Sequence, residues 1–495
     1  MGNSNPLFLG IDLGTTNGKV ACFDRWGNLQ ASSSRPTTTF FPNPGWYEQR
    51  PEQWLILLEE ALSEIVSILG LKSQDIEAIS IANFGPGMIM IQGNSVLAPC
   101  PTWQDERCWA QGERLIEEVG PGWIGLGVPQ TGFPAKILWA NENAPELILK
   151  ADKILDIKAY LLNWLTGVMA TDPSSGPGAK NWHTPVFDYV DCPIERLPVV
   201  KQTTDLVGVI KPEIAERVGL PKGISVFAGL NDGAAATLGS GVCKYGQTII
   251  TLATNGVVRI VIPGPLDGDL LIKKGLFNWP FIDDMWICGG ATLSGAGSLQ
   301  WIADLLGIPN EVEAYNELLD NASQIPIGSR GVVFIPYLAG RGTPASDPKV
   351  RGGFLNLGLE HGRYELVRAV LEGLTFAILE IFNEIQALNF VVKTINLTGG
   401  GARSMLWQQM ISDVLESQLL YAGGDATLGC AIVAAVGSGV YTSFQEAVDN
   451  MVHPFSQVVP DSQRSRSYKQ VFHYFQHTRD AVLDAPYPRF EWECL

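Results

Sequence analysis

The stretch Ala228–Gly241, AGLNDGAAATLGSG, places one carboxylate, Asp232, between an apolar run and a series of small residues. Ile224–Ala228 is typical of a buried strand, and Gly233–Leu238 is typical of a helix that packs closely against its neighbours. Such a strand-to-helix turn is where α/β proteins present their chemistry. Asp232 is therefore either a general base that activates a hydroxyl for attack on a nucleotide phosphate, or an ordinary helix cap. The stretch alone favours the cap.

Length and composition indicate a globular protein with at least two large domains. The chain has 495 residues, 46% of them hydrophobic and only 17% charged, with 53 Gly and 31 Pro that predict many turns. A net charge of −17 argues against nucleic acid or a membrane surface as a partner. It does not argue against ATP, because backbone amides, helix N-termini and a metal can hold phosphates locally.

The cysteines and the apolar runs predict a cytoplasmic protein. The eight Cys are scattered without a CxxC pair, which is typical of reduced, buried thiols. The chain enters a strand at Leu7 without a basic, apolar leader, so we expect no signal peptide. No apolar run is long enough to span a membrane.

Two similar hairpins lie about half a chain apart. Asn-Gly between Leu7–Asp12 and Lys19–Asp24 predicts the first hairpin. The amides and hydroxyls of its turn could wrap a phosphate, and Asp12 could hold Mg²⁺; alternatively the turn is an ordinary polar one. Thr254-Asn255-Gly256, within the strand–turn–strand pattern of residues 248–262, repeats Thr16-Asn17-Gly18. The repeat suggests a duplicated α/β domain pair in which only the first copy carries the acid.

A cluster of Trp103, Gln104, Asp105 and Arg107 offers an apolar face together with hydrogen-bond donors and acceptors. This combination could bind a polyhydroxylated molecule. The alternative is the start of a polar helix with Asp105 in its first turn.

Further patterns predict the remaining elements and narrow the chemistry. Helices are expected over 51–69, 131–143, 157–166, 364–382, 405–416 (capped by Ser404) and 427–436, and strands over 76–82, 88–92, 332–335 and 395–398. The glycines at 399–401 would let a flat base lie against the backbone. The chain has no GxxxxGK[ST] motif and no GxGxxG after the first strand. No His lies near Asp12, Asp105 or Asp232 in the sequence. Catalysis would therefore rest on carboxylates.

With these motifs in this order, the chain resembles the FGGY family of carbohydrate kinases, most closely its xylulokinase and gluconokinase branches. The resembling segments are Asp12–Thr16, Trp103–Arg107, Gly229–Gly241, Thr254–Gly256, Gly352–Glu372 and Gly399–Ala402. The resemblance implies two duplicated actin-like (ribonuclease H-like) ATPase domains with a cleft between them. The expected domains are 1–245, with the sugar site and the base, and 246–485, with the nucleotide site, followed by a peripheral tail, 486–495.

The resemblance also implies the residues of the site. Asp232 would be the catalytic base, and Asp12 would hold Mg²⁺. The sugar would be bound by Met88, Trp103, Gln104, Asp105, Arg107, Asn231 and Asp232. ATP would be bound by Gly14, Thr15, Thr16, Asn17, Lys19, Thr254, Asn255, Gly256, Gly297, Gln300, Gly400, Gly401, Ala402 and Ser404.

The implied reaction is transfer of the γ-phosphate of ATP to a hydroxyl of a small sugar, with a ketopentose such as xylulose as the first expectation. Gly85-Pro86-Gly87-Met88 stands where xylulokinases usually carry Met-His, and Asn231-Asp232-Gly233 looks closer to gluconokinases. A gluconokinase-like or polyol kinase is therefore the alternative, and an actin- or chaperone-type ATP switch is the alternative outside sugar kinases. A homodimer is left open.

Overall fold

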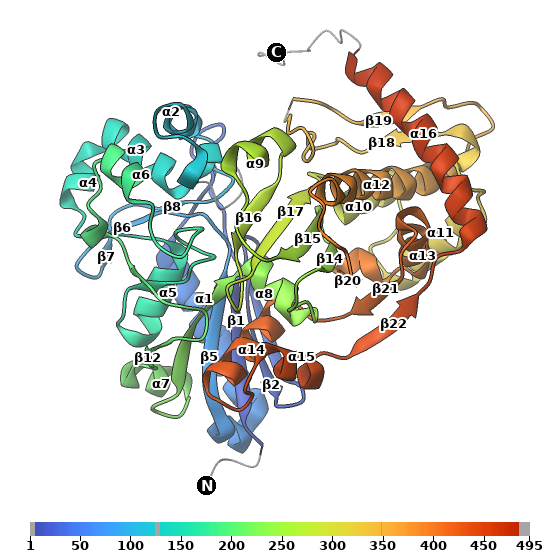
Figure 1. Cartoon of the computed structure of the whole chain (residues 1–495). Helices are drawn as coiled ribbons and strands as arrows, with labels where there is room; N and C mark the ends of the chain where they lie inside the picture. Colours follow the sequence, from blue (N-terminus) through green and yellow to red (C-terminus); the bar gives the residue numbers. More distant parts are fainter. Residues whose placement is uncertain (1–4, 124–128, 348, 485–495) are drawn as a thin grey trace.

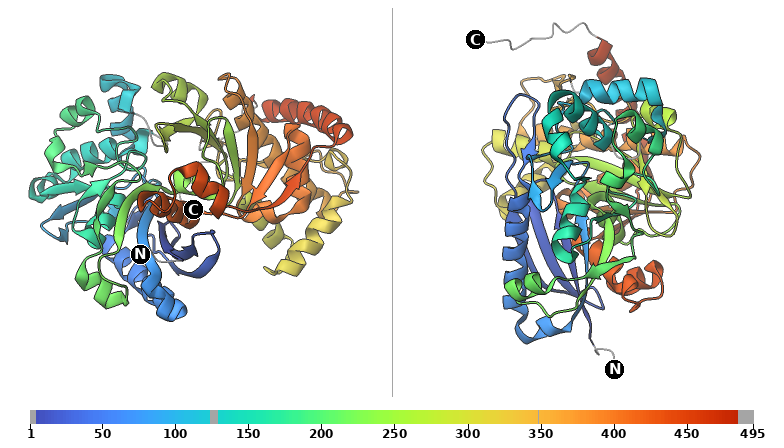
Figure 2. Two further views of the ribbon diagram at one scale, coloured as in Figure 1. Left: turned by 60° about the horizontal axis from the view of Figure 1, so that its bottom comes forward. Right: turned by 90° about the vertical axis from the view of Figure 1, so that its left-hand side faces the viewer.

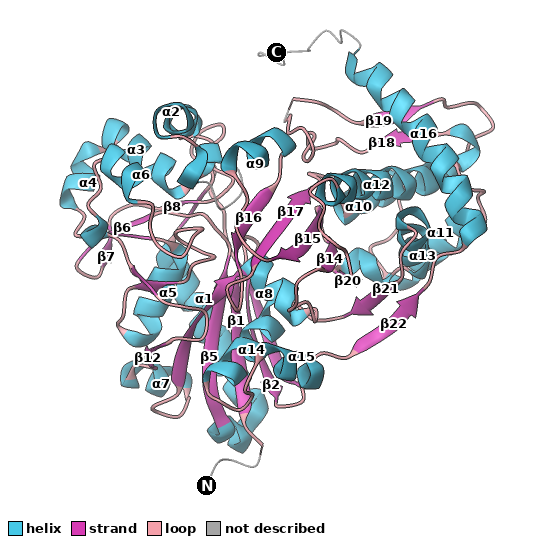
Figure 3. Cartoon of the chain, in the orientation of Figure 1, coloured by secondary structure: helices cyan, strands magenta, loops and turns pink. Residues whose placement is uncertain are grey.

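The computed structural model describes residues 5–123, 129–347 and 349–484. The chain forms two lobes, each built on one large β-sheet with helices against it (Figure 1). The N-terminal elements form one lobe, and most elements after residue 245 form the other, as a second view confirms (Figure 2). Colouring by secondary structure shows the two sheets meeting near the middle of the molecule (Figure 3).

The first large sheet has the strand order β12-β13-β5-β1-β2-β3. Its strands are β1 (Leu7–Leu13), β2 (Asn17–Asp24), β3 (Leu29–Pro36), β5 (Ile76–Asn83), β12 (Leu206–Val209) and β13 (Ser225–Asn231). β1 and β2 form the predicted antiparallel hairpin, while β5 runs parallel to both β1 and β13. The carboxyl ends of β1, β5 and β13 therefore share one edge of the sheet.

The second large sheet has the order β16-β17-β15-β14-β20-β21-β22. Its strands are β14 (Gln247–Leu252), β15 (Gly256–Ile262), β16 (Phe277–Pro280), β17 (Trp286–Ala291), β20 (Thr394–Thr398), β21 (Leu419–Ala422) and β22 (Pro454–Val458). β14 and β15 form the second predicted hairpin, and β20 runs parallel to β14 and β21.

The two sheets repeat one topology. In each, an antiparallel hairpin (β1–β2, β14–β15) is extended on one side by an antiparallel strand (β3, β17) and on the other by two parallel strands (β5 and β13, β20 and β21). Parallel neighbours require crossover connections, and here these carry helices. The predicted duplication of an α/β unit is thereby confirmed.

The helices cover the sheets and fill the space around them. They are α1 (Pro51–Leu69), α2 (Trp109–Val119), α3 (Phe133–Asn143), α4 (Pro145–Lys150), α5 (Ile157–Thr166), α6 (Thr184–Tyr189), α7 (Pro212–Val218), α8 (Asp232–Gly239), α9 (Gly268–Lys274), α10 (Ala296–Leu305), α11 (Val312–Ser323), α12 (Arg363–Gln386), α13 (Met405–Leu415), α14 (Ala426–Gly437), α15 (Phe444–Met451) and α16 (Ser462–Asp484). Smaller two- and three-stranded sheets are made by β4 (Glu48–Gln49), β6 (Ile89–Gln92), β7 (Ser95–Val96), β8 (Cys100–Pro101), β9 (Lys153–Leu155), β10 (Ala170–Thr171), β11 (Val199–Val200), β18 (Val333–Ile335) and β19 (Gly353–Leu355). Ser404 caps α13 as predicted, since its hydroxyl accepts from the Trp407 amide.

Helix α14 belongs late in the sequence but packs on the first sheet, beside β1 and β5 (Figure 1). A buried apolar cluster links the lobes there, with Phe8 and Phe227 from the first sheet, Ile249 and Val261 from the second, and Ile432 from α14. Each lobe also has its own core. The late helix thus contributes to the edge of the first sheet where Asp12 and Asp232 lie.

Two expectations about local structure are wrong. Trp103–Arg107 does not begin a helix; it forms turns, and α2 starts only at Trp109. The Glu106 amide donates to the Gly45 carbonyl and the Asp105 carboxylate accepts from the Tyr47 amide, so these residues are committed to a neighbouring loop. The cap of α8 is Asn231, not Asp232. The predicted peripheral tail, 486–495, lies outside the described residues.

No described helix has the length and apolar character that a membrane span requires.

Candidate active site

The two predicted acids lie at neighbouring places on the shared edge of the first sheet. In the strand register, Asp12 of β1 is opposite Ala82 of β5, and Ala82 is opposite Leu230 of β13. Asp232 follows two residues later as the first residue of α8. Parallel strands bring their carboxyl ends to one edge, so the sequence places both carboxylates in one site.

The residue before the proposed base performs the capping. Asn231 Oδ1 accepts from the Ala234 amide at 2.7 Å, which satisfies an amide that the first turn of α8 would leave unpaired. The adjacent Gly233 amide donates to Oδ1 of the Asp232 carboxylate at 2.7 Å, and no side chain among the described residues donates a hydrogen bond to this carboxylate. Its second oxygen is therefore available for a substrate hydroxyl. Asn231 also bonds Ser174 through its amide and its side chain, so its predicted contact with a sugar competes with structural contacts.

The pKa of the Asp12 carboxyl group is raised strongly in the folded protein. Burial, together with the charges of Asp232 and Asp425, raises the pKa of Asp12 to about 8, against the opposing effect of Lys19 and Lys158. Its Oδ1 atom is buried and has no hydrogen-bond partner among the described residues. A buried, unpartnered carboxylate oxygen among other acids is a place where a cation would be stabilised.

Arg259 of β15 brings a positive charge from the second lobe to Asp232, the predicted base. Burial lowers the pKa of Arg259 to about 10, and Asp232 opposes that shift. Burial likewise raises the pKa of Asp232, while the Gly233 amide, Arg259 and Lys158 lower it. The Arg259 guanidinium lies so close to Gly233 that a Cβ there would be 3.2 Å from its Nη2 atom. A base with a raised pKa beside a guanidinium suits proton abstraction next to a phosphate.

Asp425 joins the same edge from α14. It caps that helix by accepting from the Thr427 and Leu428 amides, and it forms an ion pair with Lys19. Burial opposes ionisation, but Lys19 and these hydrogen bonds lower the pKa of Asp425. Lys19, predicted to contact ATP, is thus held by a carboxylate in this structure.

Two of the predicted sugar-binding residues, Asp105 and Arg107, form contacts inside the protein that hold a neighbouring loop. Arg107 forms ion pairs with Asp105 and Glu48, each at 2.7 Å, and its guanidinium lies over the Trp46 ring at 3.7 Å. Asp105 is fully buried, and both of its oxygens accept hydrogen bonds. These two side chains therefore hold the 45–48 loop, and a role in binding sugar stays a prediction for them.

Trp103 and Met88 have opposite environments. Trp103 is 39% exposed, and its indole donates to the Thr15 hydroxyl at 2.9 Å, with half-buried Gln104 next to it in the chain. Met88 is instead buried in the apolar cluster of the 88–197 region. The structure thus joins the predicted sugar segment to the first phosphate turn through Trp103, and it does not bring Met88 to that place.

Hydrogen bonds hold the first predicted phosphate turn, residues 14–17, in place. The Gly14 amide donates to the Asn17 carbonyl, and the Thr15 carbonyl accepts from the Gln49 side chain at 2.8 Å. The Thr16 carbonyl accepts from the Thr37 amide. These bonds fix the turn, and within the described part of the chain no residue forms a hydrogen bond with the Thr16 hydroxyl or the exposed Asn17 side chain.

The predicted nucleotide residues Thr254, Gly297 and Gly400 belong to the second lobe, the first in the turn between β14 and β15, the second in the first turn of α10 and the third just after β20. The Thr254 carbonyl accepts from the Gly295 and Gly297 amides, at 2.8 and 3.2 Å, which joins the second hairpin to the start of α10. Gly399 has φ 94° and lies against the Leu252 backbone, where a Cβ would be 2.5 Å from the carbonyl oxygen. A Cβ on Gly400 would meet nothing within 4 Å, so this backbone offers open space.

The other predicted nucleotide residues have packing roles. The Gly256 amide donates to the Thr292 hydroxyl, the Ala402 carbonyl accepts from Gln408, and Gln300 bonds Asp304 within α10. Asn255 closes the hairpin turn through its carbonyl, which accepts from the Ala253 amide. Gly401 lies against the Trp407 ring.

Two residues of this site, Arg259 and Asp425, were not expected from the sequence. Arg259 is a single charge within the apolar strand Gly256–Ile262, a pattern that marks a charge with a specific partner. Asp425-Ala426-Thr427-Leu428-Gly429 has the same form as the Asp232 stretch, an acid before a small-residue helix. The packing of α14 on the first sheet brings Asp425 close enough to Asp12 to raise the pKa of Asp12.

The described residues are compatible with one Mg²⁺ ion held chiefly by a nucleotide. They contain no group of three His, Cys, Asp or Glu side chains that could hold a metal. Mg²⁺ bound with a nucleotide usually takes only one or two carboxylates, the remaining ligands being phosphate oxygens and waters. Asp12, with its unpartnered oxygen, fits that single protein ligand.

Two lobes with repeated sheets, a half-buried carboxylate where they meet and a glycine-rich turn in the second lobe are typical of a phosphotransferase of the two-domain ATPase class. Residues 7–239 match the model of the FGGY family of carbohydrate kinases, N-terminal domain, and residues 279–438 match that of its C-terminal domain. The chain belongs to the FGGY family of carbohydrate kinases, and it is a sugar kinase.

Curated relatives align over nearly the whole chain. A xylulose kinase of Escherichia coli is 32% identical, covering 94% of this chain and 96% of its own, and one of Bacillus subtilis is 30% identical, covering 95% and 97%. A gluconokinase of Bacillus subtilis is 28% identical, covering 94% of both chains. Among solved structures, a xyloylose kinase from Brucella ovis matches with a TM-score of 0.87 at 24% identity, covering 96% of this chain and 99% of that one. This last likeness confirms the predicted fold.

Proposed function

We propose that this sugar kinase transfers the γ-phosphate of ATP to a hydroxyl of a ketopentose such as xylulose, with Asp232 as general base. The observation that carries the proposal is that Asn231 caps α8, whereas the Asp232 carboxylate, near Arg259, accepts no hydrogen bond from a side chain of the described residues. In the step, the hydroxyl proton passes to Asp232 and the sugar oxygen bonds the γ-phosphorus. The bond from that phosphorus to the β–γ bridging oxygen breaks, and ADP leaves.

The nucleotide side of the proposal uses the second lobe. The turn at Thr254 and the open backbone at Gly400 would receive phosphates and base, and the Arg259 guanidinium would offset charge on the transferred group. Asp12 would hold Mg²⁺, which neutralises phosphate charge when bound. We propose residues 1–245 as the half with the sugar site and the base, and 246–485 as the nucleotide half.

Xylulose is preferred as the acceptor because the xylulose kinases of Escherichia coli and Bacillus subtilis are more identical to this chain than the gluconokinase is. Gluconate is the second candidate, supported by that gluconokinase and by the Asn231-Asp232-Gly233 segment. Polyols are the third. The ATP-switch alternative loses its support, because the chain is a member of a sugar kinase family.

A substrate panel tests the proposal. Purified protein with Mg-ATP is supplied with xylulose, other pentuloses, pentitols, gluconate and glycerol, and ADP formation is followed. We expect the highest kcat/KM with xylulose. A higher kcat/KM with gluconate would mean that gluconate, and not xylulose, is the acceptor. If no compound of the panel increased ADP formation, the proposed reaction would be contradicted.

We also propose a cytoplasmic enzyme whose partners are its small substrates. Seven buried cysteines are free thiols, which fits a reducing compartment. The net charge of −17 supports the expectation that it binds neither nucleic acid nor membrane, and a homodimer remains open.

A further inference from the structure

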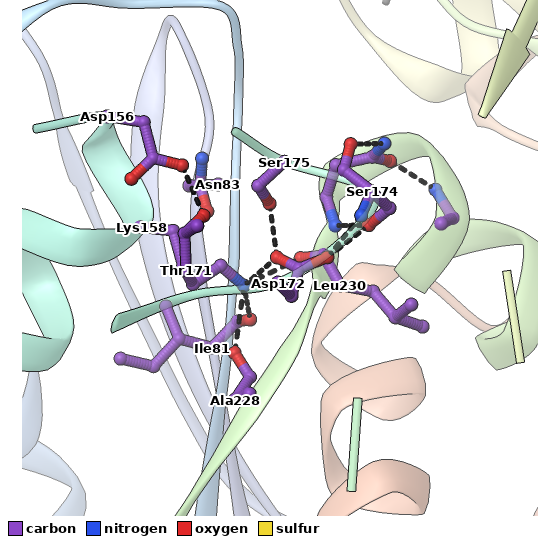
Figure 4. A network of polar contacts seen from close by, with 12 residues as sticks. Ile81, Asn83, Asp156, Lys158, Thr171, Asp172, Ser174, Ser175, Ala228 and Leu230 are labelled. Carbon is purple, nitrogen blue, oxygen red and sulfur yellow. Dashed lines mark hydrogen bonds and ion pairs between the residues drawn. The ribbon is translucent and has the colours of Figure 1, made fainter. Parts of the chain in front are cut away.

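A chain of buried polar groups connects α5 to the start of α8, and Figure 4 shows Lys158, Asp172 and Ser174 within it. It starts at Lys158 of α5, passes through Asp172 and Ser174 in the loop after β10, and ends at Asn231. All four side chains are at least 96% buried. The reaction described above assigns them no step other than the capping by Asn231.

Lys158 fills a defect in the first sheet. The pairing of β13 with β5 is interrupted between Phe227 and Leu230, where Gly229 adopts φ 87°. The Lys158 ammonium lies at this interruption and donates to the Ala228 carbonyl at 3.2 Å, the Leu230 carbonyl at 2.9 Å and the Ile81 carbonyl. An ammonium has three donors, so it satisfies the three carbonyl groups that the broken ladder leaves.

Asp172 links this ammonium to the start of α8. Its Oδ2 atom is 3.4 Å from Lys158 Nζ, and the pairing offsets the cost of burying the charge. Its Oδ1 atom accepts from the amide and hydroxyl of Ser174. The Ser174 hydroxyl in turn accepts from the Asn231 amide at 2.8 Å, and the Ser174 carbonyl accepts from the Asn231 side chain at 2.8 Å.

Several backbone groups just before Asp232 are thus held by buried side chains. The carbonyls of Ala228 and Leu230 are held by Lys158, the amide and side chain of Asn231 by Ser174, and the Ala234 amide by Asn231. Rotation or shift of this segment would move the carboxylate that follows. A displacement of about 1 Å at a reacting group costs on the order of 100-fold in rate.

We infer that the buried chain Lys158–Asp172–Ser174–Asn231 is a positioning device for Asp232, with Ser174 as the link between the ion pair and the base. This inference rests on the proposed function, since it assigns the device to the base named there. Lys158, Asp172 and Ser174 are positioning residues and do not touch the reacting atoms.

Two neighbouring serines allow a matched test. The hydroxyls of Ser174 and Ser175 both donate to Asp172, both are buried, and only Ser174 contacts Asn231. Ser174→Ala should lower kcat about 10- to 100-fold with both KM values within about 3-fold, because the base is misplaced only for transfer. Ser175→Ala should keep kcat within about 3-fold, although both variants lose a buried hydrogen bond and melt at lower temperature.

Kinetics, melting temperature and ADP affinity are measured together for both variants, the parent and Asp232→Asn. Equal kcat for Ser174→Ala and Ser175→Ala, or a Ser174→Ala effect confined to KM, would overturn the inference. If Ser174→Ala does not fold, Ser174→Cys replaces it, because a thiol fills the space with a weak hydrogen-bonding group. An unchanged kcat in Ser174→Cys would likewise overturn it. Failure of the proposed function is distinguishable, since it would appear as sugar-dependent turnover retained in Asp232→Asn or absent from the parent.

Discussion

At the scale of single residues, Asn231 and Asp232 stand next to each other at the start of α8 and have different roles. Asn231 caps the helix, and Asp232 is the proposed base. Asn231 accepts the capping bond from the Ala234 amide, and among the described residues Asp232 accepts hydrogen bonds from backbone amides and from no side chain. A carboxylate fully occupied by amides would be a weaker base, because hydrogen bonds to its charged form lower its pKa. The amide side chain before the acid thus keeps the acid available.

A prediction about pH concerns Asp12. Burial, Asp232 and Asp425 raise its pKa from 3.8 to about 8, so the folded protein retains a proton that the unfolded chain has lost. This group therefore destabilises the folded state increasingly as the pH rises from about 4 to about 8. Asp12→Asn removes the penalty and should raise the free energy of unfolding at pH 8 by at least about 1.4 kcal/mol, the value of one pKa unit.

Urea unfolding at pH 5 and pH 8, in buffer without metal or nucleotide, checks this expectation. The gain from Asp12→Asn should be smaller at pH 5. If Asp12→Asn raised the free energy of unfolding equally at both pH values, or lowered it at pH 8, the pKa of Asp12 would not be raised in the folded protein.

Site residues that stand in a recognisable local pattern were predicted from the sequence. Site residues that reach the site only through tertiary packing were missed. Asp12 and Asp232 stand at strand ends, which a pattern of apolar runs reveals. Arg259 and Asp425 reach the same edge from elements more than 240 residues after Asp12, and no local pattern encodes that meeting. The expected helix at Trp103–Arg107 failed because the loop contacts of Asp105 and Glu106 outweigh the helical pattern.

At the scale of elements, close glycine contacts bring α14 against the first sheet and α8. A Cβ on Gly429 would lie 1.9 Å from the Ala235 carbonyl oxygen, and one on Gly10 would lie 1.9 Å from the Thr427 carbonyl oxygen. The small residues of both helices, visible in the sequence, permit this approach. The approach carries Asp425 to Lys19 and so completes the charged edge.

Gly429→Ala should destabilise the protein by about 1–3 kcal/mol or more, because the added methyl group collides with backbone that cannot move aside. The direction is informative, since Gly→Ala within an open helix would instead stabilise it by about 1 kcal/mol. Gly264→Ala is the control: a Cβ there meets nothing within 4 Å. Urea unfolding of both variants checks the prediction, and a Gly429→Ala variant as stable as the parent would contradict the packing described for α14.

Element types and order were largely predictable, and their pairing in space was not. α1 and α5 begin and end at the residues that the sequence indicated. Pro51 opens α1, and in the structure the Asp156 side chain caps α5 by accepting from the Ala159 amide. The two hairpins were predicted by Asn-Gly and confirmed. The two sheets share the order of six strands, to which the second sheet adds β16, and this likeness follows only from the pairing of distant strands, which short patterns do not contain.

At the scale of the whole molecule, the two lobes carry separable parts of the proposed reaction. The base and its positioning chain belong to the first sheet, and the proposed nucleotide contacts belong to the second. Arg259 and the cluster around Phe8 and Ile249 connect the lobes. Binding of nucleotide and transfer of phosphate should therefore respond differently to a change at Asp232.

The most direct measurement compares sugar-dependent ADP formation and ADP affinity in the parent and in Asp232→Asn. The amide cannot accept the hydroxyl proton, so kcat should fall by about 10²-fold or more, the usual contribution of general base catalysis. The Kd for ADP should stay within about 3-fold, because uniform nucleotide binding does not depend on the base. Retained sugar-dependent turnover in Asp232→Asn would contradict the assignment of Asp232 as the base.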